Sequence, residues 1–385
     1  MKLAVVTETF PGERRVGLIP NHVPQLVKAG LEVLVQSGAG IAAGFVDQAY
    51  ADKGARIVST REEAFQADIV VQVRTLGANL TAGRDDLSKL RKGQVLIGMC
   101  DPLGEPRAVR EIAQTGATLF ALELIPRTTR AQSMDVLSSM ATISGYRAVL
   151  LGAVELPKVF PMLMTAAGTL TAARAFVIGA GVAGLQAIAT AKRLGAVVRA
   201  YDVRPACREQ VESLGGKFVE LPLESGDAQD KGGYAKALGE EFYKKQRELM
   251  AKVVSESDVV ITTAAIPGKP SPQLITAEAI ASMPAGGVVV DLAAERGGNC
   301  ALTQADQRVV SGGITILGPT NLPSEVPTHA SQMFSGNVTA FLLNLVIKGE
   351  LVLNKEDDII RETMVAQDGA ITNARLSDLL AASPT

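Results

Sequence analysis

A glycine-rich segment at residues 179–184 is the part of the sequence that points most directly to chemistry. It reads Gly179-Ala180-Gly181-Val182-Ala183-Gly184, a G-x-G-x-x-G pattern, and an apolar strand-like stretch precedes it. Gly179 permits a tight turn, Gly181 lets a pyrophosphate approach the backbone, and Gly184 lets the next helix pack closely on the strand. Free N–H groups at the start of that helix attract phosphate. The segment therefore predicts a dinucleotide site.

An aspartate placed 18 residues after this segment indicates which dinucleotide is bound. A helix is predicted from Leu185 to Leu194, and the strand after it ends at Tyr201-Asp202. Asp202 is expected to accept hydrogen bonds from the adenosine ribose and to repel a 2′-phosphate, which favours NAD(H) over NADP(H). Arg204 argues the other way, because an arginine there can bind a 2′-phosphate. In the alternative interpretation, the glycines only form a tight strand–helix junction.

A polar segment between residues 123 and 139 carries groups suited to a nucleotide. Arg127, Gln132 and Asp135 offer donors and acceptors for a ribose and a carboxamide, and the segment falls between two predicted domains, where nucleotide clefts often lie. Residues 133–135 fit a helix start with acidic bias equally well. Taken without other knowledge, the residues favour that simpler interpretation.

A second polar segment, residues 225–234, is rich in glycine and follows a strand predicted at 218–221. A long loop inside a compact domain is usually functional or disordered. Tyr234 is the large apolar residue at its end. The pattern fits a loop that closes over a bound nucleotide and a solvated linker that ends at a helix start equally well, so both interpretations stay open.

Scarce histidine limits the chemistry that the chain can perform. Dehydrogenases that oxidise an alcohol or an amine need an acid or base, commonly His or Lys, beside the hydride acceptor. The sequence has only His22 and His329, and each is expected to be structural. Hydride transfer between two nicotinamides moves no proton at the reacting carbons, so it needs no such base. The protein then supplies position and exclusion of water.

The elements that must position these residues alternate between strand and helix. In the first half of the chain, strands are predicted at residues 3–7, 31–35, 67–73 and 94–98, and in the second half at residues 175–178, 196–201, 258–262, 287–291 and 313–317. Helical stretches lie between most of them. Such alternation predicts parallel βαβ units. We therefore expect an α/β protein of two Rossmann-like domains, each with a doubly wound parallel sheet.

A long helix is predicted to join the two domains. Residues 134–160 are mostly helical in pattern, and a helical run after Pro327 is expected to return to the first domain. The first Rossmann-like domain then takes residues 1–137 and about 325–385. The NAD(H)-binding domain takes residues 138–324, with a mobile loop at about 223–235.

Composition excludes several classes of protein. The 385 residues are 47% hydrophobic and 20% charged, which is typical of a soluble globular chain and not of a disordered one. A net charge of −2 disfavours a nucleic-acid partner. Three isolated cysteines form neither a disulfide framework nor a zinc pattern, so we expect no metal and a reducing cytosol. The apolar stretch 175–191 is short for a membrane span and fits a strand, a turn and a helix.

Several longer motifs together are more specific than the glycines. They are Pro126-Arg127, Arg130-Ala131-Gln132-Ser133-Met134-Asp135, and residues 144–149, 164–169, 181–196, 232–236 and 266–270. On these residues the chain resembles, over nearly its whole length, the NAD(H)-binding domain of proton-translocating nicotinamide nucleotide transhydrogenase. That domain is the soluble N-terminal part of the alpha subunit.

The resemblance implies a homodimer in which each chain holds NAD(H) in a cleft between two Rossmann-like domains. Arg127, Gln132 and Asp135 would be the catalytic residues, because they would position the nicotinamide ribose near NADP(H) on the partner. The resemblance places the cofactor-binding residues at Ser138, Gly179, Gly181, Val182, Ala183, Gly184, Asp202, Val203, Arg204, Gly233, Tyr234, Thr263 and Ala264. The mobile loop would be the one ending at Tyr234.

The resemblance also implies the partners of the chain. The NADP(H)-binding beta subunit would receive hydride from NADH, coupled to inward proton movement. Because the sequence has no membrane helix before Thr385, it looks like the split form, with a separate membrane-spanning alpha-2 subunit; a fragment would look the same. The chain is then expected in the cytoplasm, peripheral on the cytoplasmic face of the inner membrane through these subunits.

Two alternatives remain from the sequence. The related alanine dehydrogenases use a lysine, a histidine and an aspartate around pyruvate. The matching places here hold Gln72 or Arg74, Cys100-Asp101 and Glu295, and only Arg15 is retained, so the substrate pocket looks dismantled. The third hypothesis is a nucleotide-binding protein without turnover, which the isolated chain would imitate because its hydride acceptor lies on another polypeptide.

Overall fold

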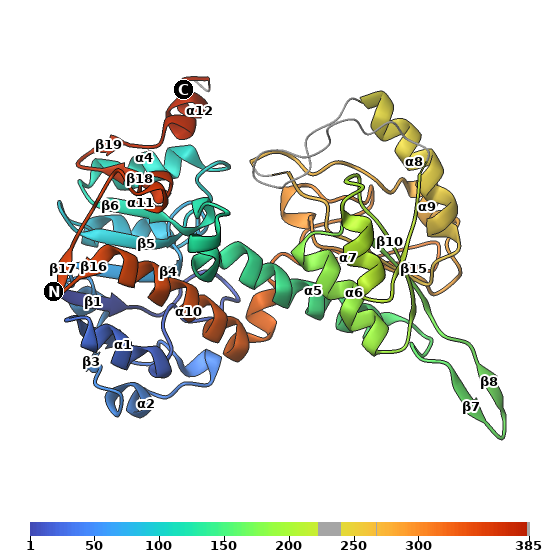
Figure 1. The fold of residues 1–385 in the computed structure, drawn as a ribbon, viewed down its shortest axis with the longest axis horizontal. Helices are drawn as coiled ribbons and strands as arrows, with labels where there is room; N and C mark the ends of the chain where they lie inside the picture. The colour runs from blue at the N-terminus through green and yellow to red at the C-terminus, as the bar shows by residue number, and fades with distance from the viewer. Residues whose placement is uncertain (222–239, 267, 383–385) are drawn as a thin grey trace. The chain divides into compact units, whose positions relative to one another are not determined.

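The computed structural model describes residues 1–221, 240–266 and 268–382, and the chain divides into two compact units (Figure 1). Unit 1 comprises Met1–Met140 and Pro323–Thr385, and unit 2 comprises Ala141–Leu322. The loop predicted at about 223–235, with Gly233 and Tyr234, lies outside the described residues. Each unit has its own sheet and its own buried core.

Unit 1 contains an eight-stranded sheet in the order β19-β18-β6-β5-β4-β1-β2-β3. Its strands are β1 (Lys2–Val5), β2 (Glu32–Gln36), β3 (Arg56–Val58), β4 (Ile69–Arg74), β5 (Val95–Met99), β6 (Thr118–Ala121), β18 (Met364–Gln367) and β19 (Ala370–Ile371). Strands β1 to β6 are parallel, as predicted. One edge of this parallel sheet is antiparallel, because β18 pairs with β6 in the opposite direction and turns back into β19.

Helices and short turns cover the sheet of unit 1. They are α1 (Val23–Lys28), α2 (Asp47–Ala51), α3 (Arg61–Ala64), α4 (Pro106–Gln114), α10 (Pro327–Leu345), α11 (Asp358–Thr363), α12 (Ala374–Ala382), and the 3-10 turns η1 (Pro20–His22), η2 (Ile41–Ala43), η3 (Gly83–Lys89), η4 (Leu122–Leu124), η5 (Thr129–Met134) and η7 (Leu322–Glu325). A small hairpin, β16 (Val346–Ile347) with β17 (Glu350–Leu351), follows α10.

Helix α10 ties the C-terminal part of the chain to the N-terminal part of unit 1. Two serines one helical turn apart on α10 accept hydrogen bonds from the irregular segment after β1: Ser331 Oγ from Val16 N at 3.0 Å, and Ser335 Oγ from Ile19 N at 3.0 Å. Both serines are fully buried. The hydroxyls thus satisfy buried backbone N–H groups that no strand partner reaches.

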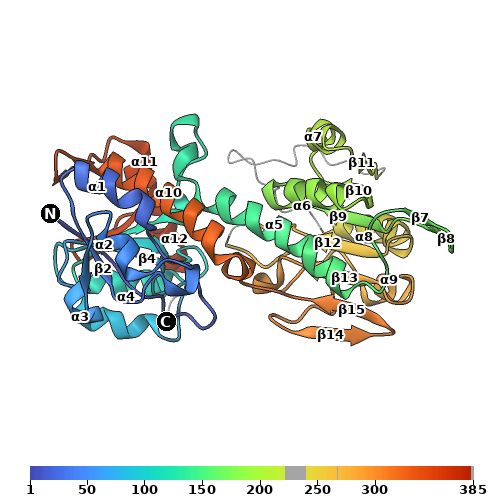
Figure 2. The same cartoon turned by 90° about the horizontal axis from the view of Figure 1, so that it is seen from below.

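Unit 2 contains a seven-stranded sheet in the order β11-β10-β9-β12-β13-β15-β14. Its strands are β9 (Arg174–Ile178), β10 (Val197–Tyr201), β11 (Lys217–Phe218), β12 (Val259–Thr262), β13 (Val288–Asp291), β14 (Arg308–Ser311) and β15 (Ile314–Leu317). Figure 2 shows β11 and β14 at opposite edges of this sheet. All pairs are parallel, as predicted, except that the edge strand β14 pairs antiparallel with β15.

Helices on both faces bury the apolar strands of unit 2. They are α5 (Val136–Glu155), which begins in unit 1, then α6 (Val182–Arg193), α7 (Cys207–Ser213), α8 (Glu240–Ser255), α9 (Ala277–Ala281) and the turn η6 (Ala294–Arg296). Alternate residues of β9 serve different cores: Ala175 and Val177 pack with α5 and α6, while Phe176 and Ile178 pack with α8 and α9. This two-sided burial explains why the strands are continuous apolar runs.

Helix α5 lies unusually close to its neighbours in unit 2. A Cβ atom on Gly145 would come within 2.0 Å of Ala183 O, and one on Gly152 within 3.0 Å of Val259 Cγ1. The helix also has the length and apolar composition of a membrane span, and 39% of that window is buried inside the structure. Core helices of soluble proteins pass the same test, so this is weak evidence for a membrane.

A hairpin projects from unit 2 in Figure 1, formed by β7 (Leu163–Thr165) and β8 (Gly168–Leu170). Every residue of its two strands is exposed. Met164 is 78% exposed, and Met162, Leu163 and Leu170 are exposed with it. An exposed apolar arm of this kind usually marks a contact with another protein or with a membrane.

Candidate functional site

The predicted dinucleotide segment lies at the carboxyl edge of the unit 2 sheet, between β9 and α6. Strand β9 ends at Ile178, Gly179 turns the chain with φ +96°, and α6 begins at Val182. The helix therefore starts three residues earlier than the predicted Leu185. In parallel sheets, ligands bind outside this edge, where the order of strands reverses; here β10 and β12 lie on either side of β9.

The three glycines of the pattern have different surroundings. A Cβ on Gly184 would lie 1.8 Å from Gly179 O, so the helix contacts the strand end directly there. Gly179 has the positive φ that favours glycine, and a Cβ would lie 2.5 Å from Thr263 Oγ1. Gly181 has φ −76° and nothing within 4 Å of an added Cβ. Neither the backbone conformation nor the packing of the protein requires a glycine at residue 181. The space above its Cα is therefore open for a ligand.

Asp202 follows β10 at the same edge and is paired with Arg204. Asp202 Oδ2 accepts from Ala180 N at 2.7 Å, and Arg204 donates from Nε to Oδ1 and from Nη2 to Oδ2, both at 2.8 Å. Burial by itself would raise the pKa of Asp202, but the hydrogen bonds and charge of Arg204 outweigh it and lower that pKa. The carboxylate is therefore ionised and bonded to the arginine that the sequence offers for a 2′-phosphate. Val203 lies half-buried between them.

Thr263 and Ala264 continue β12 at this edge. Thr263 N donates to Ile178 O at 2.8 Å, and Thr263 Oγ1 donates to Gly179 O at 3.1 Å. These bonds join the end of β12 to the first glycine of the turn. The structure thus brings Gly179, Gly181, Val182, Ala183, Gly184, Asp202, Val203, Arg204, Thr263 and Ala264 together at one sheet edge in unit 2.

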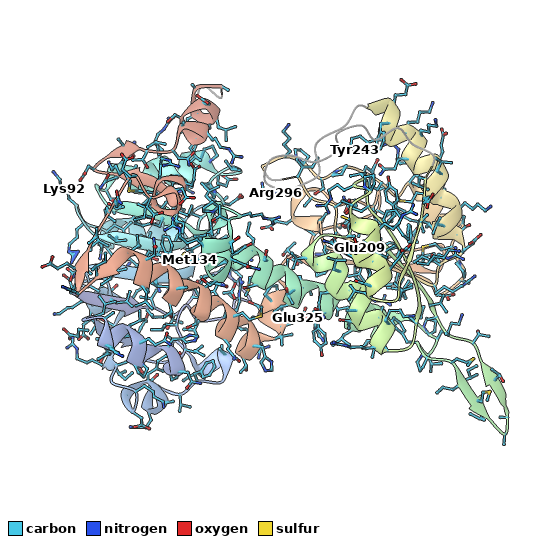
Figure 3. The ribbon with its side chains drawn as sticks, in the orientation of Figure 1. Lys92, Met134, Glu209, Tyr243, Arg296 and Glu325 are labelled. Carbon is cyan, nitrogen blue, oxygen red and sulfur yellow. The ribbon has the colours of Figure 1, made fainter. Side chains whose placement is uncertain are left out.

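Arg127, Gln132 and Asp135 lie in unit 1, in and around the turn η5. Arg127 and Gln132 are exposed. Asp135 caps α5, because its Oδ1 accepts from Ser138 N at 2.9 Å and its Oδ2 accepts from Ser138 Oγ at 2.6 Å. The helix-start interpretation therefore describes the local structure of Asp135. Figure 3 labels Met134, the buried last residue of η5, directly before this cap.

The η5 segment is held by the C-terminal part of unit 1. Asn337 Nδ2 on α10 donates to Ser133 O at 2.8 Å. Arg130 forms an ion pair with Asp357 and Asp358 at the start of α11, and its Nη1 donates to Asp357 Oδ2 at 2.9 Å. The segment that carries Gln132 is thus fixed at both ends, while the Gln132 side chain stays exposed.

Sequence reasoning missed several residues that shape the dinucleotide edge. Gly145 on α5 is needed because Ala183 O lies where its Cβ would be. Asp291 and Asn299 are both fully buried: Asp291, the last residue of β13, accepts from Thr262 at the end of β12, and Asn299 bonds to Ala264 just after that strand. A glycine inside a strongly helical pattern is a signal of close approach that could have pointed to Gly145. The asparagine carries no such signal.

A second polar cluster lies in unit 1, around Arg15, the one residue expected to match the alanine dehydrogenase pattern. Glu13 accepts from Arg15 Nε at 2.7 Å and Nη2 at 2.6 Å, and from Arg74 Nε at 3.1 Å; Ser324 Oγ also bonds to it. Burial opposes ionisation of Glu13, but Arg15 and Ser324 outweigh it and lower its pKa to about 2. Because Arg15 is buried and bonded on two nitrogens, its charge is already matched inside the protein.

Glu123 is a buried carboxyl group in unit 1 whose titration is expected to affect stability. Its Oε1 accepts from Cys100 N and Asp101 N, both at 2.7 Å, while Oε2 has no partner among the described residues. Burial is the main cause that raises the pKa of Glu123 to about 7. A folded-state pKa above the unfolded value means that the folded chain binds the extra proton. This contribution to stability is complete below about pH 4.5 and is lost as the pH rises through 7.

We therefore expect the thermal stability to fall between about pH 4.5 and pH 7, with on the order of 2 kcal/mol of that fall due to Glu123. Glu123→Gln removes the titrating group and should flatten the curve, whatever its effect on absolute stability. Glu8 keeps part of the slope in this variant, because burial also raises the pKa of its carboxyl to about 7. Melting temperatures measured across this pH range test the prediction. If the melting temperature depended on pH equally in Glu123→Gln and in the parent, the role of Glu123 would be contradicted.

No group of His, Cys, Asp and Glu side chains that could hold a metal ion occurs in the part of the chain that the structure describes. A parallel sheet with a glycine turn, a helix N-terminus and an aspartate after the neighbouring strand defines unit 2 as a dinucleotide-binding domain of the Rossmann type. Models of both domains of one family match the chain: "Alanine dehydrogenase/PNT, N-terminal domain" at residues 4–144 and "Alanine dehydrogenase/PNT, C-terminal domain" at residues 148–374. The chain belongs to this alanine dehydrogenase/PNT family.

Within the family, the similarity favours one branch. One relative is the first part of NAD(P) transhydrogenase subunit alpha from Rhodospirillum rubrum. It is 48% identical to this chain, over 98% of this chain and 99% of its own length. Alanine dehydrogenase of Bacillus subtilis is 26% identical over 97% of this chain and 93% of its own. The solved transhydrogenase from Sinorhizobium meliloti superposes with a TM-score of 0.84 at 40% identity, over 97% of this chain and 99% of its own.

Proposed function

We propose that the chain is the NAD(H)-binding subunit of a proton-translocating transhydrogenase. The observation that carries the proposal is the dinucleotide edge of unit 2 in a chain that is 48% identical, over nearly its full length, to a transhydrogenase alpha subunit. Hydride passes from C4 of NADH to C4 of NADP⁺ held by the beta subunit, with both electrons, and proton translocation takes place in the partner subunits. The enzyme is active only with those partners.

The residues of this chain act by binding and position. The N–H groups at the start of α6 receive the pyrophosphate, and the open space over Gly181 lets it approach. Asp202 accepts from the adenosine ribose. Arg127, Gln132 and Asp135 orient the nicotinamide ribose, and their exposed or half-buried polar groups on a tethered segment suit that role. Because the reacting carbons exchange no proton, the lack of a catalytic histidine is consistent with this reaction.

The exposed hairpin of unit 2 supports a homodimer. Beside it, a hollow of about 770 Å³ is lined by residues at the end of α5 and at the end of α6, among them Leu156, Pro157, Val159 and Leu194. Val159 in this lining and Met164 on the hairpin are exposed apolar side chains, which a contact with a second copy would cover. The further partners are the beta subunit and a separate membrane-spanning alpha-2 subunit, which hold the chain on the cytoplasmic face of the inner membrane.

Two measurements test the proposed function. The purified chain should bind NADH, titrated by nucleotide fluorescence, far more tightly than NADPH. Mixed with an NADP(H)-binding beta subunit and NADPH, it should then reduce an NAD⁺ analogue at a rate that needs both proteins. Steady NADH production from alanine and NAD⁺ by the chain alone would instead favour an alanine dehydrogenase, and binding without partner-dependent turnover a non-catalytic nucleotide-binding protein.

Asp202→Ala is expected to weaken the preference for NADH over NADPH by about tenfold or more. The variant loses charged hydrogen bonds to the ribose, and it removes the carboxylate that pairs with Arg204 and would repel a 2′-phosphate. Binding constants for the two nucleotides measure it. Asp258→Ala is the matched control, because Asp258 is also buried and bonded to an arginine, Arg174, at the opposite end of β12. The same preference in Asp202→Ala and the parent would contradict the assigned role.

A further inference from the structure

A buried asparagine bonds to the loop that follows β12. Asn299 is fully buried. Its Oδ1 accepts from Ala264 N at 3.0 Å, and its Nδ2 donates to Ala264 O at 2.8 Å and to Pro272 O at 2.9 Å. The side chain therefore pairs with both backbone groups of Ala264, as a neighbouring strand would. Both amide hydrogens and the acceptor are used, which is the arrangement that makes a buried polar group stabilising.

Asp291 holds this asparagine in place. Its fully buried carboxylate accepts from Asn299 N at 2.7 Å and Cys300 N at 3.0 Å, and also from Ala293 N and the hydroxyls of Thr262 and Thr303. Gly298 has φ +82°, and a Cβ there would lie 2.7 Å from Asp291 Oδ2. The chain between Asp291 and Asn299, where Figure 3 labels Arg296, therefore wraps the carboxylate and returns the asparagine to β12.

The bonds of Ala264 connect this network to the dinucleotide edge. Thr263, one residue earlier, bonds to Ile178 O and Gly179 O, so hydrogen bonds join the glycine turn to the end of β12. Without Asn299, both backbone groups of Ala264 would lose these side-chain partners. Asn299 itself is too deeply buried to touch a ligand outside the sheet edge. Any effect it has on a bound nucleotide must pass through the backbone groups to which it bonds, those of Ala264 and Pro272.

We propose that Asn299, anchored by Asp291, is a positioning residue for the dinucleotide: it fixes the backbone of Thr263 and Ala264 at the edge where the nucleotide binds. The inference rests on the proposed binding of NAD(H) at this edge. It predicts that the shape-conserving variant Asn299→Asp disturbs binding in a pH-dependent way. An ionised carboxylate would place an oxygen against the two carbonyl oxygens of Ala264 and Pro272, whereas a protonated one can donate to one of them.

The experiment measures NADH binding by the full chain at about pH 6 and about pH 9. Relative to the parent at the same pH, Asn299→Asp should bind NADH about threefold more weakly at the lower pH and more than tenfold more weakly at the higher one. Asn373→Asp is the matched control in unit 1, because Asn373 is buried and its Nδ2 donates to Glu362 O at 3.1 Å. It should lower the melting temperature and leave NADH affinity unchanged at both pH values.

The possible failures are distinguishable. A folded Asn299→Asp variant that binds NADH as the parent does at both pH values would overturn the positioning role alone. A parent chain that binds no NADH would defeat the proposed function instead. If Asn299→Asp does not fold, Asn299→Ser replaces it, since a hydroxyl is too short to pair with both groups of Ala264. If folded Asn299→Ser bound NADH as tightly as the parent does, this result would also overturn the inference.

Discussion

Gly181→Ala is expected to weaken NADH binding by tenfold or more while the melting temperature stays within about 1 °C of the parent. An added methyl group meets nothing within 4 Å, and the φ of −76° is one that alanine adopts freely. Only a ligand that needs the open space would detect the methyl. Thermal melts and fluorescence titration measure the two effects separately, and unchanged affinity would mean that the pyrophosphate does not lie over Gly181.

Gly184→Ala is the matched contrast on the same turn. Its methyl group would come within 1.8 Å of Gly179 O, so either α6 or the end of β9 must move. Overpacking of this kind costs about 3 kcal/mol, which lowers the melting temperature by several degrees in a chain of this size. Stability and affinity should therefore fall together. If Gly184→Ala melted like the parent, the close helix–strand contact would be wrong.

Gln132→Ala is expected to lower partner-dependent hydride transfer by about 100-fold, with less than about a threefold change in NADH affinity. The side chain is exposed on a segment that Asn337 and Arg130 hold in place, so its loss removes orientation without disturbing the fold. Single-turnover rates with saturating NADH and the beta subunit measure it. Arg127→Ala should behave in the same way.

The control for this prediction is Gln48→Ala in unit 1. Gln48 is also an exposed glutamine. Its Nε2 donates to Asp52, the residue at the C-terminal end of α2. It should transfer hydride at the rate of the parent. Equal rates in Gln132→Ala and Gln48→Ala would remove the η5 segment from the mechanism.

Features that depend on local pattern were predictable from the sequence. The strand–glycine–helix order at residues 175–191 predicts β9, its turn and α6. The apolar pattern indicates the strand and the helix, and the glycines indicate the turn between them. The antiparallel edges were missed although their signals are local. Gly312-Gly313 joins β14 to β15 and Asp368-Gly369 joins β18 to β19, and all four residues have positive φ, as in two-residue hairpins.

Contacts between distant segments could not be predicted in this way. A Cβ at residue 145 is excluded by the carbonyl oxygen of Ala183, 38 residues later, and Asn299 bonds to Ala264, 35 residues earlier. Neither relation has a period or a fixed spacing, because the folding of the sheet brings the partners together. The positions expected of Arg127, Gln132 and Asp135 toward a nucleotide came from resemblance alone, and they stay predictions.

Unit 1 is made from both ends of the chain, and this sets an order for its formation during synthesis. Unit 2 is one continuous segment, so it is complete before the residues from Pro323 onward are made. The first 140 residues must meanwhile wait for α10 and β18, with the N–H groups of Val16 and Ile19 lacking their serine partners. The N-terminal segment is therefore expected to expose apolar surface until these later elements have been made.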